Sequence, residues 1–273
     1  MTGNYFTCER LTDHVSRIKD ILGVAIYLVE GSDRACVIDT GHGIGNLREY
    51  VEMLTALPTF VILTHGHIDH ANGAALWSEV YMNPLDAEVY EEHSSPDFRR
   101  KEMASHAQIC DIPENAYVPA AEKPFLPLED GQVFDLGGIT LEAIWTPGHT
   151  PGMTMILIRE ERMILFGDGC GLEVLLVFPS SSNVSQYRAT LMKIKPFEDR
   201  YDRIIRNHGT CESPKELLDN CIACCDDILA GTDSAMPVCF GPIKALSARE
   251  VNAEHARIDG KQGNILYTPD KRC

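Results

Sequence analysis

Basic residues are scarce in this chain. Its 273 residues include 24 lysines and arginines against 40 aspartates and glutamates, which gives a formal net charge of −16 at pH 7. Phosphate binding requires clustered lysine and arginine, and the sequence has no such cluster. We therefore expect a small-molecule substrate rather than a nucleic-acid partner.

Long hydrophobic runs are missing as well. The first nine residues are polar and mixed, unlike a charged-then-apolar leader, and no later stretch approaches the roughly 18 apolar residues of a membrane span. We therefore expect a cytoplasmic protein with no membrane partner. The chain has no tandem repeat, and its length suits one domain over residues 1–273. The sequence leaves homo-oligomer formation open.

Cysteine, by contrast, is plentiful, with ten residues. Disulfide frameworks belong to short secreted chains, so we expect free thiols. Cys221, Cys224 and Cys225 fall on the apolar stripe of a predicted helix, which favours burial in a core over metal binding. Cys170 and Cys211 closely follow two candidate metal ligands, and we expect them to line a pocket without acting as nucleophiles.

Two predicted outer-layer helices begin with capping residues. Ser213 is the expected N-cap of the cysteine-bearing helix, and Glu216 would complete a capping box. Asn46 and Glu49 make a similar start for a helix from residue 47 onward.

The most informative feature is the run Thr64-His65-Gly66-His67-Ile68-Asp69-His70. Three imidazoles and a carboxylate within six residues have no folding rationale, because they crowd titratable groups. His65 and His67 project to one side of an extended segment, and Asp69 and His70 follow around the bend. Imidazole and carboxylate suit zinc, and iron and manganese also accept them. The run therefore predicts metal binding.

Other candidate ligands lie just past the ends of predicted strands. Strands at 59–63, 141–145, 163–166 and 203–206 lead to His65, His149, Asp168 and His208 respectively. Loops that leave rigid strands are where layered α/β proteins place ligands. We therefore expect these side chains to form one centre for two divalent metal ions. Asp168 has two carboxylate oxygens and can bridge the ions.

The remaining histidines are expected outside this centre. A lone histidine in a loop is more often a solvated side chain than a ligand. This interpretation applies to His14, His93, His106 and His255. For His42 a turn position is the simpler interpretation, although it could approach the site.

Two segments are candidates for the walls of a substrate pocket. Residues 84–124 depart from the strand pattern and contain helix-permissive runs between prolines, which indicates an inserted helical lid or a packed surface connection. Residues 172–179 are apolar and follow Asp168. They favour an acyl or similarly apolar substrate portion, or belong to the core.

Several motifs along the chain occur in a familiar order. They are the histidine run, Thr-Pro-Gly-His-Thr-Pro-Gly at 146–152, Phe-Gly-Asp at 166–168, Asn-His-Gly at 207–209 and a strand ending in Asp-Thr-Gly at 39–41. In these motifs the chain resembles the metallo-β-lactamase fold superfamily. The resemblance implies an α/β fold, a four-layer αββα sandwich with the metals at one edge between two sheets. It also implies two similar halves that divide near 131–138.

The resemblance also implies a distribution of ligands. His65, His67 and His149 would hold the first metal, Asp69, His70 and His208 the second, and Asp168 would bridge them.

The ligand set predicts a dinuclear hydrolase. In it a metal-bridging hydroxide attacks the carbonyl of a thioester, lactone or ester of a small metabolite. Asp69 is the expected catalytic carboxylate, which orients the hydroxide and carries a proton to the leaving group. The alternatives are an oxidoreductase resembling the persulfide dioxygenases, which use one iron in this fold, and a phosphodiesterase.

Overall fold

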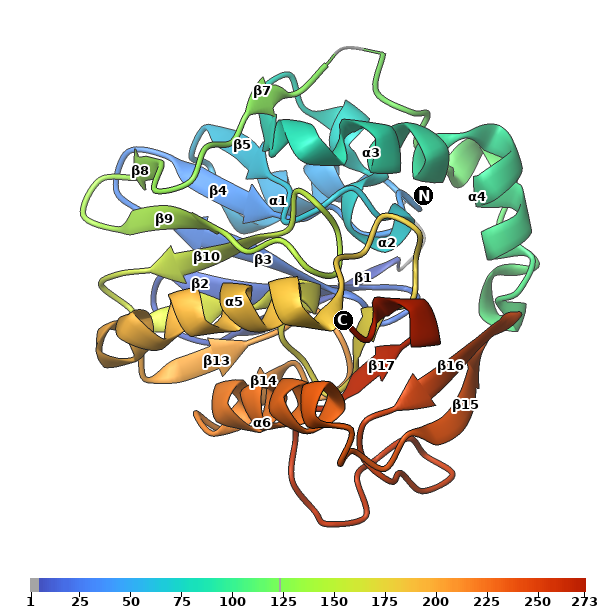
Figure 1. The fold of residues 1–273 in the computed structure, drawn as a ribbon. Coiled ribbons are helices and arrows are strands. Elements are labelled where there is room, and N and C mark those ends of the chain that lie inside the picture. The colour runs from blue at the N-terminus through green and yellow to red at the C-terminus, as the bar shows by residue number, and fades with distance from the viewer. Residues whose placement is uncertain (1–4, 123) are drawn as a thin grey trace.

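The N-terminal half of the chain folds into a seven-stranded sheet in a computed structural model that describes residues 5–122 and 124–273 (Figure 1). Its strands, in spatial order, are β1 (Phe6–Arg10), β2 (Val15–Asp20), β3 (Ala25–Glu30), β4 (Ala35–Ile38), β5 (Thr59–Ile62), β6 (Val80–Met82) and β7 (Leu126–Pro127). Strands β1 to β4 pair antiparallel, and β4 to β7 pair parallel. The predicted apolar strand at 59–63 is confirmed as β5, which is buried after its first residue.

The second sheet has six strands and uses the C-terminal half. In spatial order they are β14 (Glu212–Ser213), β13 (Arg203–Ile205), β11 (Met163–Leu165), β10 (Thr154–Ile158), β9 (Thr140–Trp145) and β8 (Val133–Asp135). The chain leaves the first sheet at Pro127 and enters the second at Val133, close to the predicted division.

The two sheets face each other across a shared core. Tyr27 and Phe60 of the first sheet and Ile156 of the second pack in one buried cluster. Helix α1 (Leu47–Leu54) covers the outer face of the first sheet, while α5 (Val184–Ile194) and α6 (Leu217–Ala230) cover that of the second. Figure 1 shows α5 and α6 on the side opposite α1. The predicted α/β sandwich is thus confirmed.

A third sheet, which the sequence did not predict as a unit, lies beside the sandwich. Its four strands are β12 (Val174–Leu176), β17 (Ile265–Tyr267), β16 (Ile243–Ser247) and β15 (Met236–Phe240). The hairpin of β15 and β16 lies on the same side of the molecule as α4 (Pro96–Met103) in Figure 1.

The segment 84–124 is largely helical. It contains α3 (Ala87–Ser94), α4 and the short 3-10 turns Pro84–Asp86, Ala107–Ile109 and Glu114–Ala116. Helix α2 (Ile68–Ala71) is a single turn within the histidine run. The remaining 3-10 turns are Ala74–Leu76, Gly167–Gly169, Lys195–Arg200 and Pro269–Lys271.

The predicted helix caps have different outcomes. Asn46 caps α1 by accepting a hydrogen bond from the Glu49 amide, as predicted. The capping box at Ser213 is wrong, because α6 begins at Leu217 and Ser213 belongs to β14. The Ser213 hydroxyl instead accepts from Arg206 and donates to Gln262.

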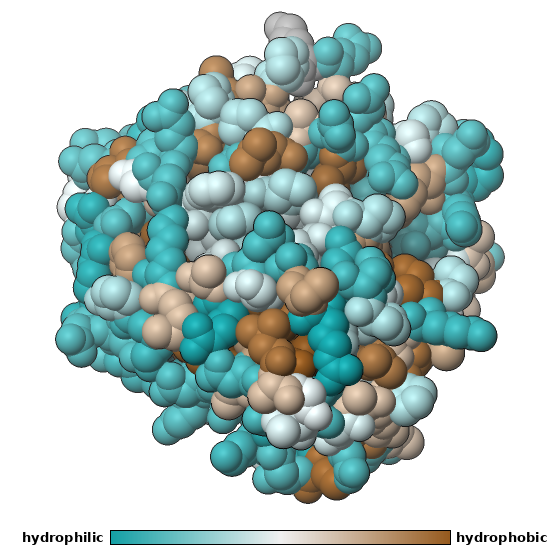
Figure 2. Space-filling view, in the orientation of Figure 1, coloured by the Kyte–Doolittle hydropathy of each residue, from teal (hydrophilic) through white to brown (hydrophobic). Residues whose placement is uncertain are grey.

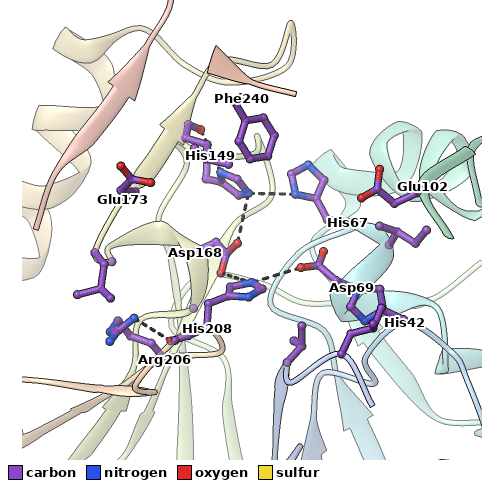
Figure 3. Close-up of a pocket in the computed structure, with 18 of the residues that line it drawn as sticks. His42, His67, Asp69, Glu102, His149, Asp168, Glu173, Arg206, His208 and Phe240 are labelled. Carbon is purple, nitrogen blue, oxygen red and sulfur yellow. Dashed lines mark hydrogen bonds and ion pairs between the residues drawn. The ribbon is translucent and has the colours of Figure 1, made fainter. Parts of the chain in front are cut away.

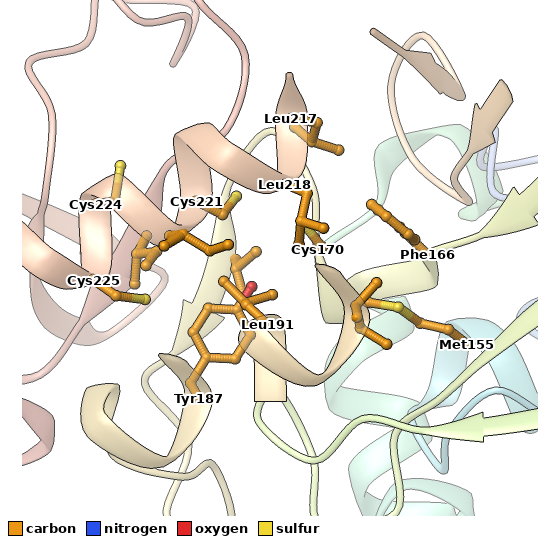
Figure 4. Close-up of a cluster of buried hydrophobic side chains, with 14 of the residues drawn as sticks. Met155, Phe166, Cys170, Tyr187, Leu191, Leu217, Leu218, Cys221, Cys224 and Cys225 are labelled. Atoms are coloured by element: carbon orange, nitrogen blue, oxygen red, sulfur yellow. The ribbon is translucent and has the colours of Figure 1, made fainter. Parts of the chain in front are cut away.

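The cysteine predictions are confirmed for the α6 thiols. All ten cysteines are free, and Cys221, Cys224 and Cys225 are buried between α6 and its neighbours (Figure 4). The expectation that Cys170 and Cys211 line a pocket is wrong. Both are fully buried, Cys170 in the core under α5 and α6 and Cys211 in the core between the sheets.

The surface seen in Figure 2 is largely hydrophilic, with apolar residues in separate patches. Single exposed apolar side chains, such as Met53 on α1, are normal on a folded protein. Among the described residues, no helix has both the length and the hydropathy needed to cross a membrane.

Candidate metal centre

The ends of four strands bring all seven predicted ligands together. β5, β9, β11 and β13 end at Ile62, Trp145, Leu165 and Ile205, and a ligand-bearing loop follows each. Three groups of side chains have ligand atoms within 4.8 Å of one another. They are His65 with His67 and His149, His65 with His70 and Asp168, and Asp69 with His70 and His208.

Two pairs of imidazole nitrogens face each other across this centre. His149 Nε2 lies 3.0 Å from His67 Nδ1, and His70 Nε2 lies 3.2 Å from His208 Nε2. Nitrogen lone pairs at such distances require a proton or a cation between them. The pairs therefore suit metal binding.

Asp168 lies between the two pairs. Its Oδ1 is 3.3 Å from His208 Nε2 and its Oδ2 is 3.7 Å from His149 Nε2 (Figure 3). The two oxygens of one carboxylate thus face different histidine groups, as a bridging ligand requires.

Outer hydrogen bonds fix the tautomers of two histidines. The Leu175 carbonyl can only accept, so His149 donates from Nδ1 over 3.0 Å and keeps its Nε2 lone pair free. Thr64 Oγ1, which donates to Asp39, accepts from His65 Nδ1 over 3.1 Å. The opposite nitrogen, His65 Nε2, is buried without a hydrogen-bond partner among the described residues. An orphaned buried acceptor fits a metal ligand better than a packed core histidine.

Two buried aspartates to which the sequence analysis assigned no role hold these loops in place. Asp39 accepts from His70 Nδ1 at 2.9 Å. Asp86, from the helical segment, accepts from Gly66 N at 2.9 Å and from Thr150 Oγ1 at 2.7 Å. Asp86 thereby joins the histidine run to the loop that carries His149.

The electrostatics of the centre favour neutral imidazoles at His65 and His67 and a carboxylate at Asp168, but a charged imidazole at His208, which must lose a proton to bind a metal. Burial lowers the pKa of His65 and of His67 well below the ordinary value, so both imidazoles are neutral. Burial alone would raise the pKa of Asp168, but His208 and His70 outweigh it and hold that pKa well below its usual range. Burial opposes the charge of His208, yet Asp168 and Asp69 raise its pKa to about 10.

Comparisons with known proteins agree with this geometry. A family model described as the metallo-beta-lactamase superfamily matches residues 20–201. The chain belongs to this superfamily. It is a metal-dependent hydrolytic enzyme, as the sequence predicted.

Two curated relatives align with most of this chain. It is 27% identical over 211 residues to the human protein "Acyl-coenzyme A thioesterase MBLAC2", covering 71% of this chain and 68% of the relative. It is 28% identical over 182 residues to "Hydroxyacylglutathione hydrolase GloC" of Haemophilus influenzae, covering 65% of this chain and 80% of the relative.

Solved structures share the fold at low identity. The "Metallo-beta-lactamase from Pontibacter korlensis" has a TM-score of 0.59 and 15% identity, covering 81% of this chain and 99% of that one. The sec-alkylsulfatase Pisa1 from Pseudomonas sp. has a TM-score of 0.65 and 13% identity, covering 83% of this chain and 42% of that one. These likenesses support the fold.

The metallo-β-lactamase fold here opens the metal centre into a cavity of about 570 Å³. One wall is apolar and includes Leu175 and Phe178 from the predicted segment 172–179, with Phe240 from the β15–β16 hairpin. The helical segment contributes Phe98 and Glu102. Whether this segment moves as a lid stays a prediction.

Histidines that we expected outside the site also line this cavity. His93, His106 and His255 line it together with His42, although none of the four belongs to the three groups of candidate ligands, as expected for the first three. Each comes from a loop or helix remote in sequence from the ligands, so spacing carried no signal for it. His14 does not line the cavity. Its Nδ1 lies 3.0 Å from the Glu30 carbonyl.

Proposed function

We propose that this protein is a dinuclear metal-dependent hydrolase of thioesters of small metabolites. The observation that carries the proposal is the bridging position of Asp168, whose two oxygens face His208 and His149. His65, His67 and His149 would hold one ion, and Asp69, His70 and His208 the other. Zinc suits these ligands, and iron and manganese also accept them.

The residues around the ions have separate tasks. When bound, the two ions supply a water of lowered pKa and polarise a carbonyl oxygen. Asp69 lies on the cavity wall, and its side chain is 22% exposed. Burial opposes its charge, but His70 and His208 hold its pKa well below the usual range, so it is a carboxylate at neutral pH. Asp69 would orient the attacking water, accept its proton and pass the proton to the leaving thiolate.

The walls of the cavity support an acyl substrate. Leu175, Phe178 and Phe240 offer an apolar surface on which an alkyl chain can be buried. Arg206 is the one arginine or lysine among the described lining residues, and its donors are engaged by Ser213, Thr210 and backbone carbonyls. We infer that the cavity holds the acyl portion rather than an anionic group. The names of the two curated relatives favour a thioester over a lactone or ester.

Elemental analysis of purified protein, joined to a panel of thioesters, lactones and phosphodiesters, tests the proposal. We expect two metal ions per chain and thioester hydrolysis. Cleavage of phosphodiesters alone would overturn it. A single iron per chain with persulfide-dependent oxygen consumption would support the oxidoreductase alternative instead. The cytoplasmic location stays a prediction.

A further inference from the structure

His93 lies against the metal centre without belonging to its ligand set. It is near the C-terminal end of α3, and its ring stacks on that of His67 with centroids 4.4 Å apart and an interplanar angle of 17°. The centroid of the Phe98 ring lies 4.0 Å from the centroid of the His93 ring. These aromatic contacts fix the plane of the His93 imidazole.

A backbone hydrogen bond determines which nitrogen of His93 carries hydrogen. The Ile68 amide donates to His93 Nδ1 over 3.2 Å. Because an amide N–H can only donate, Nδ1 must offer a lone pair. In a neutral imidazole the other nitrogen then carries the hydrogen, so His93 is in the Nε2–H form.

The Nε2–H group is available to a ligand, because it is not a buried atom and His93 lines the substrate cavity. His93 is part of the cavity lining, and no side chain or backbone group among the described residues accepts from its Nε2. The glutamate and arginine side chains of the cavity are poorly suited to donate. Glu102 and Glu173 are acceptors when ionised, and the N–H groups of Arg206 already donate to the His208 carbonyl and to Thr210.

We propose that His93 is a substrate-binding residue whose Nε2–H donates a hydrogen bond to an oxygen of the acyl portion. The assignment rests on the proposed thioester hydrolysis. His93 would hold this oxygen beside His67, while the apolar wall holds the alkyl chain. The competing role is structural, in which His93 supports only Ile68 and the His67 ring.

Two substitutions separate the roles because they keep different halves of the imidazole. In His93→Asn the side-chain amide reaches the Nδ1 position and can accept from Ile68, but it does not reach the cavity. In His93→Gln the amide reaches the Nε2 position and can donate into the cavity. The probes are the hexanoyl thioester of N-acetylcysteamine, its ketone analogue with a methylene between sulfur and carbonyl, and an alkyl thioether of equal length.

Binding and turnover are measured on holoenzymes with matched metal content. We expect His93→Asn to weaken binding of the ketone about tenfold and to lower kcat/KM for the thioester by a similar factor, the effect of one uncharged hydrogen bond. Binding of the alkyl thioether should not change, and His93→Gln should bind the ketone within about twofold of wild type. Ketone binding by His93→Asn equal to that of wild type would overturn the proposal.

A measurement without substrate separates this proposal from the proposed function. Nitrogen-15 NMR of the imidazoles, with His93 assigned from the His93→Gln spectrum, should show hydrogen on Nε2. Hydrogen on Nδ1 overturns the His93 proposal alone. Wild-type protein that hydrolyses no thioester overturns the proposed function instead.

Discussion

Asp39 accepts a hydrogen bond from His70, with 2.9 Å between Oδ2 and Nδ1, and both side chains are fully buried. The same carboxylate accepts from the Thr64 amide at 2.7 Å and from the Asn207 side chain at 2.9 Å. Thr64 and Asn207 each directly precede a proposed ligand. One buried carboxylate therefore positions two ligand-bearing segments, the histidine run and the loop of His208, and it orients His70 with its Nε2 toward the centre.

Asp39→Asn should lower metal affinity without unfolding the protein. Asp39 has a φ of 64°, and asparagine tolerates this left-handed backbone as aspartate does. The amide nitrogen of asparagine cannot accept from His70, and loss of such an outer contact weakens metal binding about 10- to 100-fold. Competition with a coloured chelator measures the affinity. Asp97→Asn, at a side chain that is 94% exposed, is the matched control. Equal affinities for both variants would contradict the expected role.

Asp168→Ala should abolish hydrolysis while the protein stays folded. The substitution removes both oxygens that face the two histidine groups, but the strands that carry those histidines keep their pairing. Loss of hydrolysis is checked by turnover of the thioester that wild type hydrolyses fastest, at matched metal content. Circular dichroism checks that the protein stays folded. Asp199→Ala, on an exposed surface, serves as the control. Full turnover by Asp168→Ala would refute the bridging assignment.

The ligands and sandwich could be predicted because their signals are local. An apolar strand such as β5 followed at once by histidines specifies both an element and the end at which its loop emerges. His93 had no comparable signal. It reaches the centre because α3 packs against α2. No local pattern in the sequence indicates this contact.

The failed cap at Ser213 has a similar origin. Its hydroxyl is in a favourable sequence context for a capping box, but the buried Arg206 guanidinium and Gln262 compete for it. The tertiary fold brings both partners to Ser213. Local propensity therefore lost to a hydrogen-bond network that only the assembled fold provides.

Phe240→Ala should impair hydrolysis of long acyl chains more than short ones. Phe240 is 40% exposed, and its ring centroid lies 5.9 Å from that of Phe178 across the apolar wall. Each methylene that loses its apolar contact costs about 0.8 kcal/mol, so two lost contacts correspond to roughly a tenfold rise in KM for an octanoyl thioester. The acetyl thioester is the internal control, and Met53→Ala on α1 is the control variant. Equal effects on both substrates would place the acyl chain elsewhere.

Glu142 supplies a pH-dependent contribution to stability far from the metal centre. Its carboxylate accepts from Arg200 Nη1 at 3.1 Å and from Arg159 Nε at 2.9 Å. Hydrogen bonding to Arg200 lowers the pKa of Glu142 against the opposing effect of partial burial, and Arg159 adds to the lowering. A carboxyl group whose pKa is lower in the folded than in the unfolded state stabilises the fold above the unfolded value of about 4.3. This contribution is lost as the pH falls through the folded-state pKa.

Glu142→Gln should therefore lower the free energy of unfolding at neutral pH but much less in acid. At pH 7 we expect a loss of about 1.5–3 kcal/mol, the range for hydrogen bonds to charged groups. Below the folded-state pKa the wild-type carboxyl is protonated, so the difference between the two proteins should shrink toward zero. Urea unfolding followed by circular dichroism at a series of pH values measures it. Glu114→Gln, at an exposed side chain with no ion pair among the described residues, should show no such trend. A difference that stayed constant down to acid pH would mean that Glu142 contributes through packing rather than through its charge.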